Sequence, residues 1–142
     1  MKLRYEAPYM ELLVIGTVES PLRDRASAPK QGDEGAPDAW LVFDPPVAEG
    51  LDGIAVGDEL LVLTWLDRAR RDVLRVHPRG DPANPEQGVF STRSPDRPNP
   101  IGLHRVTVLL IDGLRLLVRD LEALHGTPII DVKPLLGSID ER

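Results

Sequence analysis

The sequence predicts a mainly β protein, a single domain whose sheet of about eight short strands closes or nearly closes into a barrel. Its apolar runs are short, rich in branched residues and regularly interrupted by glycine, proline and charged residues. A chain of 142 residues is long enough for one core and too short for two comfortable ones. Residues 1–142 are therefore expected to form one domain with long polar loops.

The expected strands follow one another along the whole chain. A two-residue connection, Asp112-Gly113, joins two of them and predicts a type I′ hairpin, because both turn positions of that type need positive φ. One or two turns of helix are expected within residues 45–57, where three glycines keep the helix short. The strands are expected at residues 12–18, 39–43, 59–66, 72–76, 88–92, 103–111, 114–119 and 128–132.

Two polar segments are too long to be simple connections in a compact domain. Residues 20–37 combine proline, glycine, alanine and charged residues, and residues 77–87 contain three prolines. We expect both segments to be lids or binding loops.

The charge balance limits the classes of function. A formal net charge of -6 and a pI near 5.0 exclude a protein that coats nucleic acid without sequence preference, because such binding neutralises many phosphates. One local basic cluster is either a phosphate-facing surface or a solvated strand edge. Its members are Arg68, Arg70, Arg71, Arg75, His77 and Arg79.

Several other classes of site have no support in the sequence. The chain has no cysteine, and its histidines, His77, His104 and His125, are scattered, so no metal is expected. No phosphate loop or dinucleotide fingerprint occurs, and Ser91 and Ser94 are expected to be loop hydrogen-bonders rather than nucleophiles. The N-terminal residues lack the apolar core of a signal peptide and no apolar run is long enough to span a membrane, so we expect a cytoplasmic protein.

Residues 88–103 form the most informative stretch of the chain. Three prolines fix φ and bias the residues before them toward extended conformations, so this segment cannot be helical and loses little entropy when it becomes ordered. Arg93 and Arg97 carry planar donors suited to carboxylate or phosphate, and Asn99 can both donate and accept. The segment is either a preorganised binding loop or a rigid surface turn.

Residues 125–134 form a second dense segment. Gly126 permits a sharp turn, and strand alternation would place Ile129, Asp131 and Lys133 on the same side. Asp131 and Lys133 are then either an exposed ion pair or catalytic candidates that point into the same cleft as the proline-rich loop, the acid as proton acceptor and the lysine as anion partner.

Four sequence elements, taken in order, point to one family. Residues 15–21 read Ile-Gly-x-Val-x-Ser-Pro, and residues 29–31 are similar to Pro-Arg-Gln. Residues 88–102 match Gly-Val-Phe-Ala-Thr-Arg-Ser-Pro-x-Arg-Pro-Asn-Pro-Ile-Gly with Ser91 in the alanine position, and residues 125–134 match Asp-Gly-Thr-Pro-x-x-Asp-x-Lys-Pro with histidine first. Over nearly its whole length the chain resembles the TsaA-like or TrmO family, which are S-adenosylmethionine-dependent tRNA adenine N(6)-methyltransferases.

The resemblance implies a mostly β methyltransferase that acts as a homodimer and binds S-adenosyl-L-methionine near the subunit interface. Members methylate the exocyclic nitrogen of threonylcarbamoyl-adenosine beside the anticodon, so tRNA is the implied partner. Arg97 and Asn99 either brace the loop or face the substrate. The implied cofactor contacts are Pro29, Lys30, Gln31, Asp67, Arg68, Arg93, Leu103, Leu124, His125, Gly126 and Thr127.

This chain departs from the family pattern at several of these positions. Asp67-Arg68 stands where many members have His-Gln, Lys30 replaces an arginine, and His125 replaces an aspartate. The chain also ends soon after residue 134, whereas longer relatives have a C-terminal domain that the family uses for tRNA. Two alternatives therefore stay open: a methyltransferase of the same fold with a small-molecule acceptor, and a non-catalytic S-adenosylmethionine-binding module.

Overall fold

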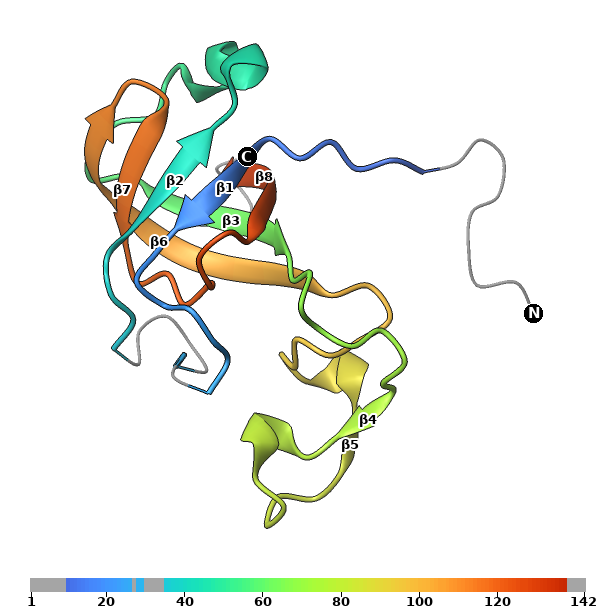
Figure 1. Ribbon diagram of the computed structural model, residues 1–142. Helices are drawn as coiled ribbons and strands as arrows, with labels where there is room; N and C mark the ends of the chain where they lie inside the picture. The colour runs from blue at the N-terminus through green and yellow to red at the C-terminus, as the bar shows by residue number, and fades with distance from the viewer. Residues whose placement is uncertain (1–9, 27, 30–34, 138–142) are drawn as a thin grey trace.

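The computed structural model describes residues 10–26, 28–29 and 35–137. Six strands in this part of the chain pair antiparallel and close into a barrel in the order β1-β2-β7-β6-β3-β8, with β8 paired to β1 (Figure 1). The predicted mainly β, barrel-like fold is confirmed. The barrel strands are β1 (Gly16–Glu19), β2 (Ala39–Phe43), β3 (Glu59–Trp65), β6 (Ile101–Asp112), β7 (Arg115–Arg119) and β8 (Pro128–Pro134).

The barrel interior is filled by side chains that alternate along the strands. In β2 the first, third and fifth residues are buried and the two between them are half-buried, and β3 and β6 show the same period of two. This alternation is what places one face of each strand in the core. The core side chains with 2% exposure or less include Val18, Leu41, Leu60, Val62, Val106, Val108, Leu116, Val118, Leu121 and Ile129.

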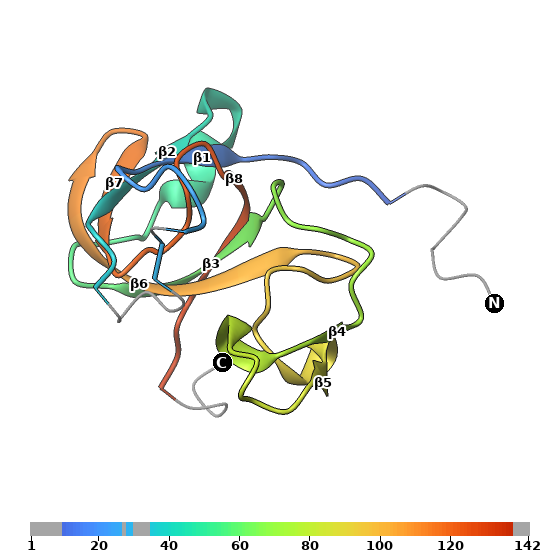
Figure 2. The same ribbon diagram turned by 60° about the horizontal axis from the view of Figure 1, so that its bottom comes forward.

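A small two-stranded unit lies outside the barrel, beyond the ends of β3 and β6 (Figures 1 and 2). It pairs β4 (Arg75–Val76) with β5 (Gln87–Gly88), and the loop between them contains the 3-10 turn η2 (Pro78–Gly80). The strand expected at residues 72–76 therefore forms only over its last two residues.

The strand expected at residues 88–92 is wrong beyond Gly88. The chain turns there into the 3-10 helix η3 (Val89–Ser91), because the Thr92 N–H donates to the Val89 carbonyl at 3.0 Å and the Arg97 side chain donates to the same oxygen at 2.6 Å. The first strand is also shorter than expected, since β1 begins only at Gly16 and residues 10–14 run away from the barrel (Figure 1).

The hairpin between β6 and β7 is confirmed, but its turn is not the expected one. Asp112 pairs with Arg115, so the connecting residues are Gly113-Leu114 rather than Asp112-Gly113. Gly113 has a φ of 58°, whereas Leu114 is not among the described non-glycine residues with positive φ. Positive φ at the first turn position alone is the pattern of type II′, not type I′. The short helix expected within residues 45–57 is found as the 3-10 helix η1 (Pro45–Leu51).

A β-bulge in β8 changes which way its side chains point. Leu63 pairs with Asp131 but Thr64 pairs with Ile129, so Ile130 is an extra residue on β8. Ile129 consequently lies in the core with 0% exposure, while the side chain of Asp131 is 49% exposed. The expectation that these two side chains share one side of the strand is wrong, because the bulge interrupts the alternation.

Candidate functional site

A cavity of about 980 Å³ lies where one end of the barrel meets the small two-stranded unit. Its walls come from the ends of β3 and β6, from the segment after β3, from the unit of β4 and β5, from the proline-rich loop and from the segment between β7 and β8. The loop of residues 20–37 also contributes Arg25, Ala28 and Pro29. Both long polar loops expected to cover a site thus contribute to this wall.

The fold brings most of the predicted cofactor positions into the same cavity. Four separate stretches of sequence supply them, so their meeting is a property of the tertiary structure. Lys30 and Gln31 lie outside the described residues, and His125, Gly126 and Asn99 are not part of the wall. The predicted residues that line the cavity are Pro29, Asp67, Arg68, Arg93, Arg97, Leu103, Leu124 and Thr127.

The three predicted residues outside the wall make contacts that hold neighbouring segments in place. The His125 Nδ1 accepts a hydrogen bond from the Ser20 backbone N–H at 3.2 Å. Gly126 has a φ of 85°, and its N–H donates to the Val18 carbonyl at 2.7 Å. Asn99 accepts a hydrogen bond from the Arg71 guanidinium at 3.0 Å. These contacts tie the segments that flank the cavity to the barrel and to each other.

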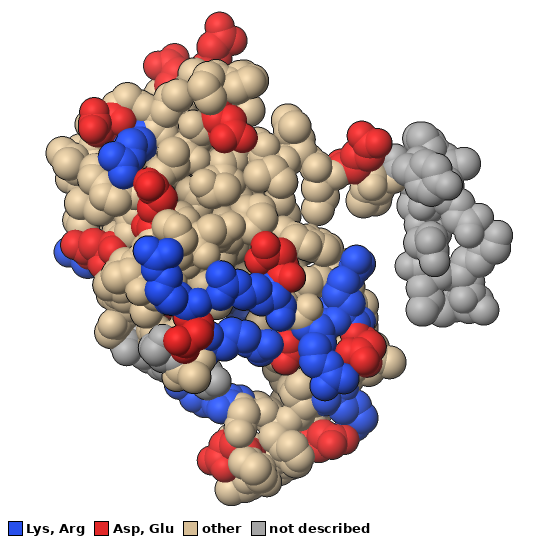
Figure 3. Space-filling view, viewed as in Figure 1, with Lys and Arg blue, Asp and Glu red and all other residues tan. Residues whose placement is uncertain are grey.

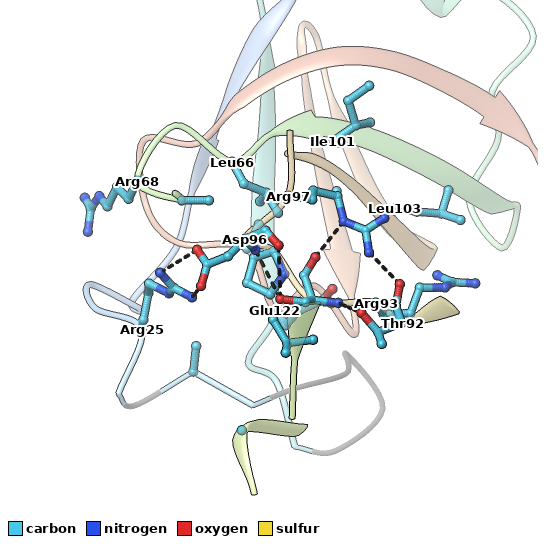
Figure 4. A pocket seen from close by; sticks show the side chains of 18 of the residues that line it. Arg25, Leu66, Arg68, Thr92, Arg93, Asp96, Arg97, Ile101, Leu103 and Glu122 are labelled. Atoms are coloured by element: carbon cyan, nitrogen blue, oxygen red, sulfur yellow. Dashed lines mark hydrogen bonds and ion pairs between the residues drawn. The ribbon is translucent and has the colours of Figure 1, made fainter. Parts of the chain in front are cut away.

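Arg97 braces the proline-rich loop from within. Its Nε donates to the Ser94 carbonyl at 2.8 Å, and its Nη2 donates to the carbonyls of Val89 and Thr92 at 2.6 and 2.5 Å. A guanidinium that collects three carbonyls of its own loop fixes the loop conformation. Of the two roles left open by the sequence, bracing is the one these contacts fulfil, although the side chain also borders the cavity (Figure 4).

An ion pair ties the loop of residues 20–37 to the proline-rich loop (Figure 4). Arg25 donates to both carboxylate oxygens of Asp96 at 3.2 and 3.0 Å, and the Arg70 backbone N–H donates to the same carboxylate at 2.9 Å. Partial burial by itself would raise the pKa of Asp96, but these hydrogen bonds and the charges of Arg25 and Arg70 outweigh it and hold the pKa below its usual value. Asp96 is therefore a charged cross-link between two walls of the cavity.

The basic cluster expected from the sequence is largely engaged in local contacts. Arg70 pairs with Asp72 at 3.1 Å, Arg75 pairs with Glu86 at 2.7 Å, and Arg71 donates to the Pro98 carbonyl at 2.7 Å. Within this cluster Arg68, His77 and Arg79 line the cavity. Figure 3 shows basic side chains gathered around a hollow on this part of the surface.

Two further cavity arginines lie at opposite ends of the close view (Figure 4). Arg68 donates to the Arg23 carbonyl at 2.7 Å. Arg93 is exposed and has no hydrogen bond or ion pair with any described residue. A guanidinium without an internal partner at a cavity wall is available to an anionic group of a ligand.

A polar cluster of Thr64, His104 and Glu122 lies at the barrel end of the cavity and was not predicted from the sequence. The Thr64 Oγ1 and the His104 Nε2 are 2.7 Å apart, and the His104 Nδ1 and the Glu122 Oε1 are 2.6 Å apart. Thr64 is 0% and His104 4% exposed, whereas the Glu122 side chain is 18% exposed. Thr64 and His104 occupy inward positions of β3 and β6, in phase with the apolar residues Val62 and Val106. A polar residue in phase with the core is the sequence signal that could have revealed them.

Gly102 makes room for this cluster. It pairs with Thr64 across the β3–β6 ladder, and a Cβ at this position would collide with the Thr64 Oγ1 and come within 2.7 Å of the His104 Nε2. Real Cβ atoms do not approach other atoms so closely. Glycine is therefore needed here for a close approach and not for a turn.

Asp131 and Lys133 lie away from the cavity. Neither belongs to its wall, and they form an ion pair at 3.3 Å with side chains that are 49% and 62% exposed. This is the exposed ion pair that the sequence left as one of two alternatives. The bulge at Ile130 accounts for the outward direction of both side chains.

The described residues contain no group of three or more histidine, cysteine, aspartate or glutamate side chains that could hold a metal ion. No described helix is long and apolar enough to cross a membrane.

Comparison with known proteins gives consistent matches. The family model of the tRNA-methyltransferase O N-terminal domain matches residues 17–141. An S-adenosyl-L-methionine-binding protein of Archaeoglobus fulgidus is 46% identical over 132 residues, which cover 92% of this chain and 93% of the relative. A probable S-adenosyl-L-methionine-binding protein of Methanothermobacter thermautotrophicus is 44% identical over 126 residues, which cover 89% of this chain and 90% of the relative.

The chain is also similar to solved structures. A crystal structure of TrmO from Pseudomonas aeruginosa superposes with a TM-score of 0.71 at 26% identity, covering 94% of this chain and 60% of that chain. A second relative from Archaeoglobus fulgidus, also a probable S-adenosyl-L-methionine-binding protein, is 44% identical over 92% of this chain but only 35% of its own length. The chain thus spans about two thirds or less of some matched proteins and nearly all of others. It belongs to the family of the tRNA-methyltransferase O N-terminal domain.

Proposed function

We propose that the cavity binds S-adenosyl-L-methionine and that the protein transfers the cofactor's methyl group to the exocyclic nitrogen of threonylcarbamoyl-adenosine beside the tRNA anticodon. The observation that carries this proposal is the meeting, in one cavity of about 980 Å³, of predicted residues from four separate stretches of the sequence, at positions 29, 67–68, 93–103 and 124–127. That volume is at the upper end of the range typical of small-molecule sites. The names of the archaeal relatives support the choice of cofactor.

The residues present fit this cofactor by their chemistry. Arg93 offers an unengaged guanidinium, which suits the carboxylate of the methionine part. Leu66 and Leu103 offer apolar surface for the adenine ring, and Asp67 offers a carboxylate that can accept from ribose hydroxyls. When bound, the cofactor supplies an electrophilic methyl group, so the protein has to align the acceptor nitrogen and assist the loss of its proton.

A nucleic-acid acceptor is compatible with the local charge despite the net charge of -6. Arg25, Arg68, Arg79, Arg93 and Arg97 line the cavity, against the carboxylates of Asp67, Asp96 and Glu122. This local excess of arginine around the hollow in Figure 3 favours an acceptor that carries phosphate. The chain covers about 60% of the solved TrmO chains, so the substrate is part of the proposal.

Methyl transfer to purified tRNA tests the proposal directly. The protein is incubated with S-adenosyl-L-methionine and tRNA from a strain lacking its gene, and the digested nucleosides are analysed by mass spectrometry. We expect a mass gain of one methyl group on threonylcarbamoyl-adenosine, and a rate that falls as salt rises. The proposal would be contradicted if the threonylcarbamoyl-adenosine of this tRNA stayed unmethylated.

The same preparation distinguishes the alternatives. A small-molecule acceptor would give methyl transfer that tRNA does not compete for and that depends little on salt. A non-catalytic module would bind the cofactor in calorimetry while every acceptor offered stays unmethylated.

We also propose that residues 1–142 form one domain that works as a cytoplasmic homodimer. The observation that supports a dimer is the exposed apolar side chains near the cavity and along the N-terminal segment, with Leu103 43%, Ile101 42% and Leu13 71% exposed. Light scattering on the eluting protein should give twice the mass of 15.7 kDa. A monomer at micromolar concentration would contradict the dimer.

A further inference from the structure

We propose that Glu122 is the catalytic residue that accepts the proton of the methyl-acceptor nitrogen, and that His104 is the positioning residue that aims its carboxylate. This inference rests on the methyltransferase function proposed above. It assigns a role to the polar cluster, which the cofactor contacts expected from the sequence do not include.

The proposal starts from the three acids in the cavity wall. Asp96 is held by Arg25 and by the Arg70 backbone N–H, so its oxygens are already occupied. Asp67 is exposed at the surface. Glu122 alone among these three combines low exposure, 18% for its side chain, with a free oxygen, because no described residue donates a hydrogen bond to its Oε2. A shielded carboxylate with one free oxygen is suited to accept a proton from a bound substrate.

His104 fixes the direction of this carboxylate. An ionised carboxylate can only accept hydrogen bonds, so the 2.6 Å contact places the imidazole proton on Nδ1. In the neutral ring Nε2 is then the acceptor, and the Thr64 hydroxyl donates to it at 2.7 Å. Both ring nitrogens are thereby used inside the protein, so His104 acts through Glu122 and not on the substrate itself.

The backbone around the cluster is built for this arrangement. Thr64 and His104 stand on adjacent strands of the closed barrel, and Gly102 gives them room that any other side chain would fill. Glu122 lies between Leu121 and Ala123, whose side chains are 0% and 3% exposed in the core. The carboxylate is therefore anchored on both sides along the chain and by a buried histidine.

The chemistry explains why a base is needed. The nitrogen of threonylcarbamoyl-adenosine stands between a purine ring and a carbonyl, so its lone pair is delocalised and the neutral N–H is a poor nucleophile. In the proposed step the nitrogen lone pair forms the new N–CH₃ bond while the bond between methyl and sulfur breaks, and that electron pair stays on sulfur as a neutral thioether. The N–H proton goes to the Glu122 Oε2, which becomes a carboxylic acid.

The decisive comparison uses three proteins: wild type, Glu122→Gln and the control Glu19→Gln. Glutamine keeps the size of the side chain and an oxygen for His104, but it cannot take the proton. Glu19 is a surface glutamate paired with Arg115 at 3.0 Å, outside the cavity wall. We expect single-turnover methylation of tRNA that carries unmethylated threonylcarbamoyl-adenosine to slow by about 100- to 10,000-fold in Glu122→Gln and to stay at the wild-type rate in Glu19→Gln.

Calorimetry with S-adenosylhomocysteine supplies a readout besides activity. Its affinity should be the same for wild type and Glu122→Gln. A parallel loss of affinity and rate would make Glu122 a cofactor-binding residue and overturn the proposal. Methylation by Glu122→Gln at the wild-type rate would overturn it as well, as would a loss in Asp131→Asn without one in Glu122→Gln.

The positioning role of His104 has its own measurement. Nitrogen-15 NMR of the neutral wild-type protein should show the His104 proton on Nδ1, and the variant His104→Phe should lower kcat while KM for tRNA is unchanged. A proton on Nε2 would overturn the assigned orientation. If wild type neither binds S-adenosyl-L-methionine nor methylates tRNA, the proposed function fails; if it does both and Glu122→Gln is as fast, only this inference fails.

Discussion

Gly102→Ala is the sharpest test of the packing at the cavity floor. The added Cβ would collide with the Thr64 Oγ1 and come within 2.7 Å of the His104 Nε2, two buried groups on adjacent strands of a closed barrel. Neither group is the far end of a long flexible side chain, so relief requires the strands or the imidazole to move. Overpacking of this kind costs about 1–3 kcal/mol.

A matched control separates this steric cost from the general effect of replacing glycine. A Cβ at Gly50 would meet no atom within 4 Å, and Gly50 has no positive φ, so Gly50→Ala changes mainly the entropy of the unfolded chain. That effect stabilises by about 0.4–1 kcal/mol and is common to both variants. The difference between the two variants is therefore the overpacking cost, which corresponds to about 3–12 °C in melting temperature for a chain of this size.

Thermal and urea unfolding followed by circular dichroism measure this difference. A double variant adds a check, because Thr64→Ala removes the oxygen that the new Cβ would meet. The destabilisation of Gly102→Ala/Thr64→Ala should fall short of the sum of the single variants by about 0.5–3 kcal/mol. Equal melting temperatures for Gly102→Ala and Gly50→Ala would refute the reasoning, as would strict additivity in the double variant.

Three further outcomes are expected. Arg93→Ala should weaken S-adenosyl-L-methionine binding about 10- to 150-fold in calorimetry, because a charged hydrogen-bond donor to the cofactor is lost, and it should leave the melting temperature unchanged, because this guanidinium has no partner among the described residues. Arg71→Ala should instead lower the melting temperature, since Arg71 contacts the proline-rich loop and lies 5.2 Å from the centre of the Trp65 ring. Equal losses of cofactor affinity in the two variants would remove Arg93 from the site. Because the pKa of Asp96 is lowered in the folded protein, its contribution to stability is present above the ordinary carboxyl pKa and is lost as the pH falls below about 4. The difference in melting temperature between wild type and Asp96→Asn should therefore shrink in acid. A difference that does not change with pH would contradict the charged cross-link. Lys133→Ala should change the unfolding free energy by less than about 0.5 kcal/mol, because its ion pair is exposed, and a larger loss in urea unfolding would show that the pair is not peripheral.

Local sequence patterns predicted much of the fold. The strand expected at residues 39–43 is β2 as observed, because alternating side chains and branched residues fit a half-buried pleated surface. The prediction of a strand at residues 88–92 is wrong because of a residue outside that segment. The Arg97 side chain donates to the Val89 and Thr92 carbonyls and stabilises a turn there. The turn after Asp112 shifted by one residue because the pairing of β6 with β7, not the dipeptide alone, fixes its position.

The candidate site was predictable only where a motif carried it. Arg93, Leu103 and Thr127 line the cavity as the family pattern implies. Residues such as His104 and Glu122 stand in no recognised motif, and they are 18 positions apart in the sequence. Their contact exists because β6 and β7 pair as a hairpin in which Thr107 faces Arg119, so the chain after β7 continues beside the first residues of β6.

By itself, the sequence determined the β class, the order of most strands, the rigid proline-rich loop and the family. These properties depend on periodicity, on the fixed φ of proline and on contiguous motifs, all of which are local along the chain. Only the tertiary structure decided that Arg97 braces its loop, that a bulge at Ile130 turns Asp131 and Lys133 outward, and that Thr64, His104 and Glu122 meet. The physical reason is that the bulge and the polar cluster depend on the pairing of strands that are separated in the chain, and that the Arg97 contacts depend on the path of the folded loop, which residue types alone do not fix.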